Sequence, residues 1–445
     1  MTVTYEVIQD TVLTGTSSIG IGASAAVTIR DAESGALVSL FEDRLGASGE
    51  SNPFNADSSG QFRVYALPGR LQITVVFNAV TRIWEDYRLG DPAIVKQNAI
   101  INGAMRVDQR DSEGTPVDAT GGTNQYGSDR WYGSEGVTSG AFTIGKVATG
   151  GPPGFPAYLR ATNTDDQSSV GAGEHAWIGQ NIEGLNLPHY ELGTSDAKDF
   201  AVGIWVRSTL TGTYCISFVN SANNRSYVAE IVISLANTWE FKTVALTGDL
   251  TGTWLITNGI GLRVRIDLGS GTDFNATADA WGAGQKSRTT NQAAWIGSAA
   301  ATFDFTGVQL ILGSVVDEKD FEHVDYATEL EQCKRYYESL GDLVVTNESF
   351  ASGYVRSTTL AQFVLRYSRK RALPSSVTLA AFGLFAVAHQ ATASSVDSAI
   401  ASSILGRNSC VIVTTFSGST LTAGDGVELR RDTSDAAFIT IDAEL

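Results

Sequence analysis

Residues 260–268, with the sequence IGLRVRIDL, alternate apolar and other side chains over their whole length. Because successive side chains of a β-strand point to opposite faces of a sheet, this period of two predicts a strand with one face on a core and the other on water or a partner. Such half-buried strands are typical of antiparallel sandwiches. The apolar face comprises Ile260, Leu262, Val264, Ile266 and Leu268, and the other face comprises Gly261, Arg263, Arg265 and Asp267.

Short apolar runs of this kind recur along the chain, separated by turn residues rather than by helices. A chain of 445 residues is too long for a single core, so we expect several domains. The predicted fold class is mainly β, with tandem β-sandwiches and a central jelly-roll-like sandwich. We expect a small β-sandwich at residues 1–90, the central sandwich at 98–327, a helical connector at 328–340 and a small β domain at 341–445.

Residues 303–337 change their hydrophobic period part-way along. The first part alternates as a strand does, and the second part has helical spacing, so a short connecting helix is predicted near residues 326–340. Asp325 can cap the start of this helix, and Gly341 follows its end. The strand residues are Phe303, Phe305, Val308, Leu310 and Leu312, and the helix face comprises Tyr326, Leu330, Cys333 and Tyr337.

The formal net charge of −17 argues against nucleic acid or an anionic membrane as the partner. No stretch reaches the roughly 20 apolar residues of a membrane helix, so we expect no membrane insertion. The start of the sequence, MTVTYEVIQD, has neither a basic region nor an apolar region of a signal peptide. The three cysteines, Cys215, Cys333 and Cys410, are odd in number and far apart, which predicts reduced, buried thiols.

Catalytic chemistry has little support in the sequence. A glycosidase needs two carboxylates that face a cleft, and the many loop acids, such as Asp165 and Asp166, show no such arrangement. The four histidines are scattered, and neither G-x-S-x-G nor H-E-x-x-H occurs. We therefore predict a protein that is not an enzyme, has no catalytic residues and needs no cofactor.

Sugar binding has better support, because proteins meet sugar rings with flat aromatic side chains flanked by polar ones. Seven of the eight Trp residues lie in the central segment. Trp205 and Trp239 fall inside apolar strands and are expected in the core, whereas other aromatic residues fall in predicted loops. Burial under a loop is the competing interpretation for the latter. The candidate carbohydrate-binding residues are Asp129, Arg130, Trp131, Tyr132, Asn223, Asn224, Arg225 and Trp281.

Two parts of the chain resemble the tailed-phage tail-fibre and tail-spike family. Residues 51–77, SNPFNADSSGQFRVYALPGRLQITVVF, resemble a small β domain found near the start of such proteins. Several blocks between residues 98 and 338 resemble the family's carbohydrate-binding, jelly-roll-type domain, and they occur in the same order. They include NAIINGAMRVDQR, DRW, ANTWEFKTVALTGDLTGTW, NGIGLRVRIDLGSGT, FTGVQLILGS and DYATELEQCKRYYE. One departure is VVDEKD after Gly313, where the family often has a shorter segment.

This resemblance implies a virion fibre or spike protein that binds a host surface polysaccharide. It also implies a homotrimer and an N-terminal domain that contacts other virion proteins. Many weak sugar sites in a trimer gain through avidity. Bound Ca²⁺ is common in sandwiches that this one resembles, and loops around Asp165 and Asp166 are candidates, although they lack the spacing of a known calcium loop. A structural virion adaptor and a polysaccharide depolymerase are the alternative functions.

Overall fold

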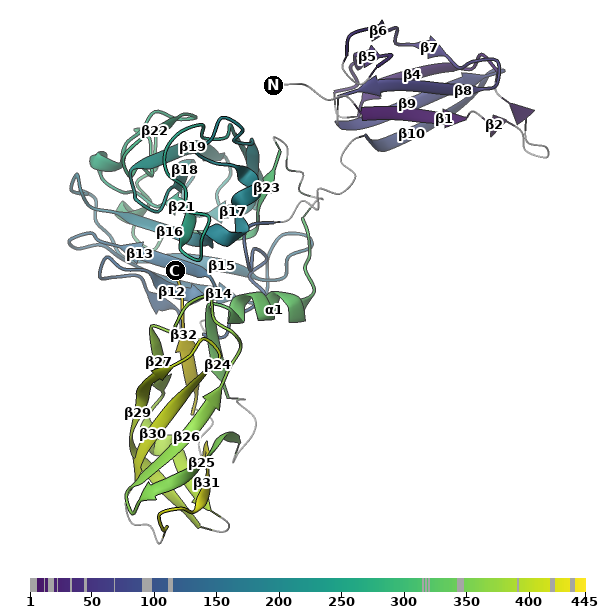
Figure 1. The fold of residues 1–445 in the computed structure, drawn as a ribbon. Coiled ribbons are helices and arrows are strands. Elements are labelled where there is room, and N and C mark those ends of the chain that lie inside the picture. The colour runs from purple at the N-terminus through teal and green to yellow at the C-terminus, as the bar shows by residue number, and fades with distance from the viewer. Residues whose placement is uncertain are drawn as a thin grey trace. The chain divides into compact units, whose positions relative to one another are not determined.

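The computed structural model divides the chain into two compact units, Met1–Lys96 and Gln97–Leu445 (Figure 1). Both units are built from β-strands, which confirms the mainly β fold class. The structure describes residues 6–11, 13–14, 20–21, 23–32, 34–43, 46–67, 69–89, 98–110, 115–313, 316, 318, 321–341, 348–389, 392–416, 421–432 and 437–445.

The N-terminal unit is a small sandwich of two four-stranded sheets. One sheet has the order β1-β8-β5-β6, and the other has the order β10-β9-β4-β7. Alternate residues of β4 and β9, such as Val27 and Ile73, fill the core between the sheets. The strands are β1 (Glu6–Thr11), β2 (Leu13–Thr14), β3 (Gly20–Ile21), β4 (Ala26–Asp31), β5 (Leu40–Phe41), β6 (Gly49–Glu50), β7 (Phe54–Asn55), β8 (Gln61–Ala66), β9 (Gly69–Phe77) and β10 (Val80–Leu89).

The central sandwich packs a six-stranded sheet, β11-β14-β15-β23-β17-β20, against a seven-stranded sheet, β12-β13-β16-β21-β18-β19-β22. One large apolar cluster joins the two inner faces, as the predicted jelly-roll-like sandwich requires. The strands are β11 (Val117–Asp118), β12 (Gln125–Ser128), β13 (Trp131–Glu135), β14 (Ala141–Val147), β15 (Tyr158–Asp165), β16 (Ala176–Glu183), β17 (Phe200–Ser208), β18 (Gly212–Val219), β19 (Arg225–Ile233), β20 (Glu240–Leu246), β21 (Ile260–Asp267), β22 (Trp281–Ala283) and β23 (Thr302–Leu312). Short 3-10 helices occur at Gly184–Asn186, Pro188–Tyr190, Thr272–Phe274, Trp295–Gly297 and Phe382–Leu384.

Strand β21 has the predicted alternation, with Leu262, Val264 and Ile266 at most 3% exposed in the core. The opposite face is not open to water, however. Asp267 is completely buried there, and it accepts hydrogen bonds from the Gly269 amide at 2.8 Å and the Ser287 hydroxyl at 2.5 Å. The chain that follows β21 therefore covers part of the polar face of its own sheet.

Strand β23 contains a β-bulge at Gly307. Its neighbour β17 pairs Gly203 with Gln309 and then Trp205 with Thr306, so two residues of β23 face one of β17. Gly307 has a φ of +60°, which suits glycine at this position of a bulge. The bulge explains why the apolar pattern steps by three residues, from Phe305 to Val308, instead of by two. The extra residue allows both of these side chains to point into the core.

Helix α1 (Tyr326–Lys334) follows the sandwich, and the carboxylate of Asp325 caps it by accepting from the amides of Ala327 and Thr328. The helix is shorter than the predicted segment 326–340. Cys333 is buried as expected, but Tyr337 begins strand β24 (Tyr337–Leu340) instead of extending the helix face.

The C-terminal part contains a closed six-stranded barrel with the order β25-β26-β30-β29-β28-β31, and a three-stranded sheet with the order β24-β32-β27. The barrel is closed, so it has no free sheet edge. No helix in the described part of the chain is long and apolar enough to cross a membrane. The strands are β25 (Ser349–Ser357), β26 (Leu360–Arg366), β27 (Ser376–Leu379), β28 (Phe385–His389), β29 (Thr392–Leu405), β30 (Ser409–Phe416), β31 (Gly426–Arg431) and β32 (Ile439–Asp442).

Candidate functional site

The first group of predicted sugar-binding residues is buried, so the expectation of an exposed loop is wrong for this segment. Asp129, Arg130, Trp131 and Tyr132 are each at most 1% exposed. Asp129 and Arg130 form the turn between β12 and β13, and Trp131 packs edge-to-face on Phe305 in the core, with ring centroids 5.0 Å apart. None of these four side chains offers a surface to a ligand in this structure.

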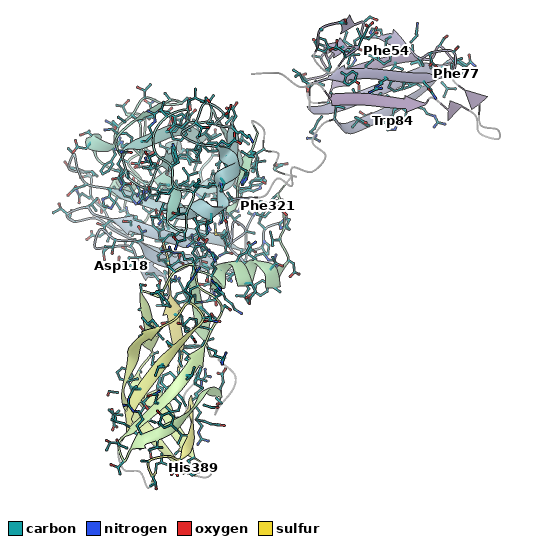
Figure 2. The ribbon with its side chains drawn as sticks, in the orientation of Figure 1. Phe54, Phe77, Trp84, Asp118, Phe321 and His389 are labelled. Atoms are coloured by element: carbon teal, nitrogen blue, oxygen red, sulfur yellow. The ribbon has the colours of Figure 1, made fainter. Side chains whose placement is uncertain are left out.

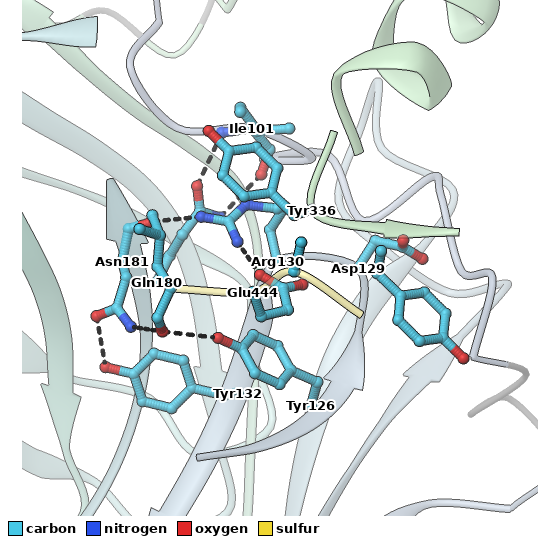
Figure 3. A network of polar contacts seen from close by, with 12 residues as sticks. Ile101, Tyr126, Asp129, Arg130, Tyr132, Gln180, Asn181, Tyr336 and Glu444 are labelled. Atoms are coloured by element: carbon cyan, nitrogen blue, oxygen red, sulfur yellow. Dashed lines mark hydrogen bonds and ion pairs between the residues drawn. The ribbon is translucent and has the colours of Figure 1, made fainter. Parts of the chain in front are cut away.

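These residues instead join the sandwich to the C-terminal part of the chain (Figure 3). The Arg130 guanidinium donates to the carboxylate of Glu444 and lies 3.6 Å from the ring centroid of Tyr336. The Asn181 amide donates to the backbone carbonyl of Leu445 at 2.8 Å, and the Tyr126 hydroxyl donates to the same oxygen at 3.3 Å. This network explains the burial, because its C-terminal members lie more than 200 residues away in the sequence.

Asp129 lies beside this network and is fully buried. Its carboxylate accepts from the backbone and side-chain amides of Gln109, at 2.5 and 2.8 Å. Burial raises the pKa of Asp129 to about 6, although the nearby Arg110 and the Gln109 hydrogen bonds oppose this rise. Asp129 is therefore a structural acid of the joint between the two domains.

The second group of predicted residues does come together. Strands β19 and β22 pair so that Arg225 lies opposite Ala283 and Tyr227 lies opposite Trp281. The Gly284 amide donates to the backbone carbonyl of Asn224 at 2.9 Å, which closes this edge. Asn223, Asn224, Arg225 and Trp281 thus lie along one edge of the seven-stranded sheet.

Trp281 is held in place while part of its surface stays exposed. Its indole N–H donates to the Thr247 carbonyl at 2.7 Å. The rings of Tyr227 and Trp254 meet it edge-to-face, each with a centroid distance of 5.3 Å. Such contacts fix an aromatic ring before any ligand arrives, which lowers the entropy cost of binding.

A bidentate ion pair fixes the neighbouring guanidinium. Arg225 donates to both carboxylate oxygens of Asp249, at 2.8 and 2.6 Å. Asp249 is 1% exposed and also accepts from the Trp254 indole at 3.2 Å, and this carboxylate raises the pKa of Arg225. We call the set Asn224, Arg225, Asp249, Trp254 and Trp281 the Trp281 edge. It offers a partly exposed ring, an oriented guanidinium and an exposed amide, which can meet the apolar face and the hydroxyls of a sugar.

A second polar-aromatic group, which was not predicted from the sequence, lies on the outer face of the six-stranded sheet. The carboxylate of Asp304 binds two guanidinium groups, those of Arg160 at 2.7 Å and Arg207 at 2.8 Å. The Arg207 guanidinium lies 4.5 Å from the ring centroid of Trp239. Trp205 and Trp239 are therefore partly exposed on this face, and their predicted place in the core is wrong. In the sequence, this group could have been predicted from Asp304, because it is a charged residue inside an otherwise apolar strand.

The described residues contain no group of three or more His, Cys, Asp or Glu side chains that could hold a metal ion. Asp165 and Asp166, which lie in the predicted calcium loop, are exposed. His323 packs on Phe155 and Phe321, with centroid distances of 5.1 and 4.9 Å, so its contacts here are with aromatic rings.

No protein-family model matches the sequence, and no curated protein matches it. Solved structures that are similar include the enzymatically active domain of bacteriophage CBA120 tailspike protein 4, with 14% identity and a TM-score of 0.24; the match covers 44% of this chain and 22% of that one. A family 11 carbohydrate-binding module of Clostridium thermocellum, in complex with a mixed-linked tetrasaccharide, has 10% identity and a TM-score of 0.23, over 46% of this chain and 99% of the module. A family 61 carbohydrate-binding module in complex with β-1,4-galactotriose has 10% identity and a TM-score of 0.23, over 49% of this chain and 99% of that one.

Proposed function

We propose that this protein is a virion fibre or spike protein that binds a glycan on the host surface and does not degrade it. The observation that carries the proposal is the Trp281 edge, where a partly exposed indole lies beside a guanidinium oriented by Asp249. The place of the protein on a virion rests on the sequence blocks that resemble tail-fibre and tail-spike proteins.

The physical basis is complementarity between this edge and a sugar ring. The ring carbons of a pyranose bear C–H groups that pack against an indole, while its hydroxyls need hydrogen-bond partners. Arg225 supplies donors in a fixed plane, and the exposed side chain of Asn224 supplies the N–H donors of its amide, whose Oδ1 already accepts from the Asn220 amide at 2.7 Å. Because these groups are already in place, little side-chain entropy is lost on binding.

A glycan array with the intact protein tests the binding role, with Trp281→Ala as the variant. We expect at least a tenfold loss of affinity for the best glycan, equivalent to about 1.4 kcal/mol. Trp239→Ala is the matched control, because Trp239 is also a partly exposed tryptophan of the same sandwich but lies on the other sheet. Equal binding by Trp281→Ala and the wild-type protein would exclude this edge as the site.

The proposal that the protein is not an enzyme needs a separate experiment. The protein is incubated with host capsule or lipopolysaccharide, and new reducing ends or unsaturated sugars are measured over time. Fragment release would favour a depolymerase, which is the less favoured alternative.

The proposed assembly is a homotrimer whose N-terminal unit contacts other virion proteins. Light scattering on the purified protein measures the oligomeric state, and a trimer is expected.

If no glycan binds to the array and host cells do not adsorb the protein, a structural adaptor such as a head spike or baseplate element becomes the better description.

A further inference from the structure

Two arginines and one aspartate lie in a row across three adjacent strands, on the outer face of the six-stranded sheet. The strand register pairs Arg160 of β15 with Asp304 of β23, and it pairs Asp304 with Arg207 of β17. Because paired residues of neighbouring strands have Cα atoms about 5 Å apart and point to the same face, both arginines reach the same carboxylate. We call these three residues the arginine row.

The arginine row carries one positive charge that no carboxylate balances. Asp304 is 1% exposed and binds both guanidinium groups, that of Arg160 through Nε and Nη2 at 2.7 and 3.0 Å and that of Arg207 through Nε at 2.8 Å. Among the residues that the structure describes, no second carboxylate forms an ion pair with either arginine. Two guanidinium charges therefore face one carboxylate charge, and an anion that binds here balances the second guanidinium.

Part of each guanidinium stays open to solvent. The Arg160 side chain is 37% exposed, and the Arg207 side chain is 20% exposed. In both residues the Nε–Nη2 edge faces Asp304, whereas the Nη1 nitrogen is neither buried nor bonded within the described part of the chain. A guanidinium is planar and its donors point outward in a fixed fork, so these Nη1 groups can donate to an anion that approaches from solvent.

Trp239 lies beside Arg207 and is partly exposed. The Arg207 guanidinium lies 4.5 Å from the ring centroid of Trp239 and 5.0 Å from that of Tyr158. The Trp239 indole N–H donates to the Gly150 carbonyl at 3.1 Å, and the indole meets the Tyr158 ring edge-to-face with a centroid distance of 5.3 Å. Both the guanidinium and the indole are therefore held in place before a ligand binds, which lowers the entropy cost of binding.

Further aromatic rings border the arginine row. Trp205 precedes Arg207 by two residues in β17, so both point to the same face of the sheet. A Cβ on Gly307 would lie 2.9 Å from Phe155 and 3.0 Å from Trp205, so these two rings are neighbours. Phe155 in turn packs on Phe321, which is labelled in Figure 2, with ring centroids 4.8 Å apart. Apolar surroundings reduce the screening of charge by water, so a contact between an arginine and an anion is stronger here than at a fully hydrated surface.

We propose that the outer face of the six-stranded sheet binds an acidic sugar of the hexuronate class. The sugar carboxylate accepts from Arg160 and Arg207, and the C–H face of the sugar ring packs on the exposed part of the Trp239 indole. A carboxylate on a protein side chain could meet the two arginines, but it brings no ring to Trp239, so a sugar fits this face better. The site shares no residue with the Trp281 edge and does not depend on the function proposed for that edge.

The test is calorimetric titration of the intact protein with D-glucuronate at pH 7, where its carboxylate is ionised. Salt at about 0.15 M screens the repulsion from the net charge of −17 beyond about 8 Å. D-glucose has the same ring without the carboxylate, and acetate has the carboxylate without a ring. We expect glucuronate to bind at least about ten times more tightly than either of them.

Two variants separate the charge from the ring contact. Arg160→Gln should weaken glucuronate binding by about tenfold, and Asp304 keeps Arg207 as its partner, so the variant is expected to fold. Trp239→Ala should lower glucuronate binding to the level of acetate. Lys198→Gln is the matched control, because Lys198 is an exposed cation of the same sandwich that pairs with a carboxylate at 3.4 Å, and its loss should leave the affinity unchanged. Thermal unfolding of each variant verifies that it is folded.

Equal affinities for glucuronate and glucose would overturn the proposal, and so would unchanged glucuronate binding in Arg160→Gln. Acetate binding as tight as that of glucuronate would also overturn it, because the site would then recognise a bare carboxylate, such as an acidic side chain of another protein. The absence of heat on titration to about 20 mM, a concentration that nearly saturates a site with a Kd of ~1 mM, has the same meaning.

The two sites are tested independently of each other. Trp281→Ala should bind glucuronate as the wild-type protein does, whatever it does on the glycan array. Because Trp239 belongs to the site proposed here, Trp239→Ala serves as the control on the array with neutral glycans.

Discussion

Arg130 and Glu444 form a buried ion pair although 314 residues separate them in the sequence. The Arg130 side chain is 1% exposed, and the Glu444 side chain is 6% exposed. Glu444 also binds Arg110 at 3.0 Å. One carboxylate therefore neutralises two arginines at the joint between the sandwich and the C-terminal part of the chain.

Replacement of Glu444 by Gln is expected to lower the free energy of unfolding by about 3–5 kcal/mol. The variant removes the charge that compensates Arg130 while that guanidinium stays buried, which is the costly way to break a buried pair. Chemical denaturation measures the loss, and faster hydrogen exchange in β24 and β32 should accompany it. Glu331→Gln is the control, since Glu331 pairs with Lys334 on the surface and is 62% exposed. That change should cost less than about 0.5 kcal/mol.

Asp129 should make the stability of the protein depend on pH. Its folded-state pKa is about 6 against an ordinary value of 3.8, so the folded state holds this proton more tightly than the unfolded state. The free energy of unfolding therefore falls as pH rises from about 4 to about 6, and the loss of about 3 kcal/mol is complete above pH 7. Asp129→Asn removes this titration. The difference in stability between wild type and variant should change by that amount between pH 4 and pH 7, and a constant difference would contradict the assignment.

The three cysteines should resist thiol reagents until the protein unfolds. All three are buried and free, as the sequence analysis predicted. Burial raises the pKa of Cys215 and Cys410 to about 11 and also raises the pKa of Cys333. At pH 8, only about one thiol in a thousand of the first two is ionised, and the thiolate is the reactive form. Mass spectrometry after alkylation should show no labelling in buffer and three labels in denaturant.

Gly307→Ala should destabilise the central sandwich by about 1–3 kcal/mol. The φ of +60° is unfavourable for alanine, and its Cβ would lie 2.9 Å from Phe155 Cζ and 3.0 Å from Trp205 Cδ1. Gly282→Ala is the matched control in the same sandwich, because a Cβ at that position would meet nothing within 4 Å. Thermal unfolding of the two variants measures the contrast, and equal melting temperatures would show that the bulge tolerates a side chain.

The sequence pattern alone was enough to predict those elements that depend on residues close to them in the sequence. The alternation of β21 and the cap at Asp325 both depend on interactions within a few residues or with a general apolar core. The glycine-centred bulge of β23 was visible only as an unexplained three-residue step between Phe305 and Val308, because a change of register depends on the partner strand β17.

The candidate sites show the same distinction between local and distant determinants. Asn223, Asn224 and Arg225 form one turn, and pairing of β19 with β22 adds Trp281, so their grouping follows from a short hairpin and one extra strand. Asp129 to Tyr132 resemble an exposed loop by composition, yet Tyr336 and Glu444 cover them. No local signal predicts that cover.

The pairing of β24 with β32 determines how mechanical load passes through the C-terminal part of the chain. Tyr337 pairs with Asp442, and Leu340 pairs with Ile439, so the strand that enters the barrel and the strand that returns from it lie side by side and antiparallel. A pull on the barrel draws both strands in the same direction and applies no shear between them. The tension then reaches the sandwich through Arg130 and Glu444 and through the Arg335–Glu183 ion pair at 2.7 Å. The contacts at this joint, these two ion pairs among them, would therefore be loaded before the strand ladder by a force that pulls the two domains apart.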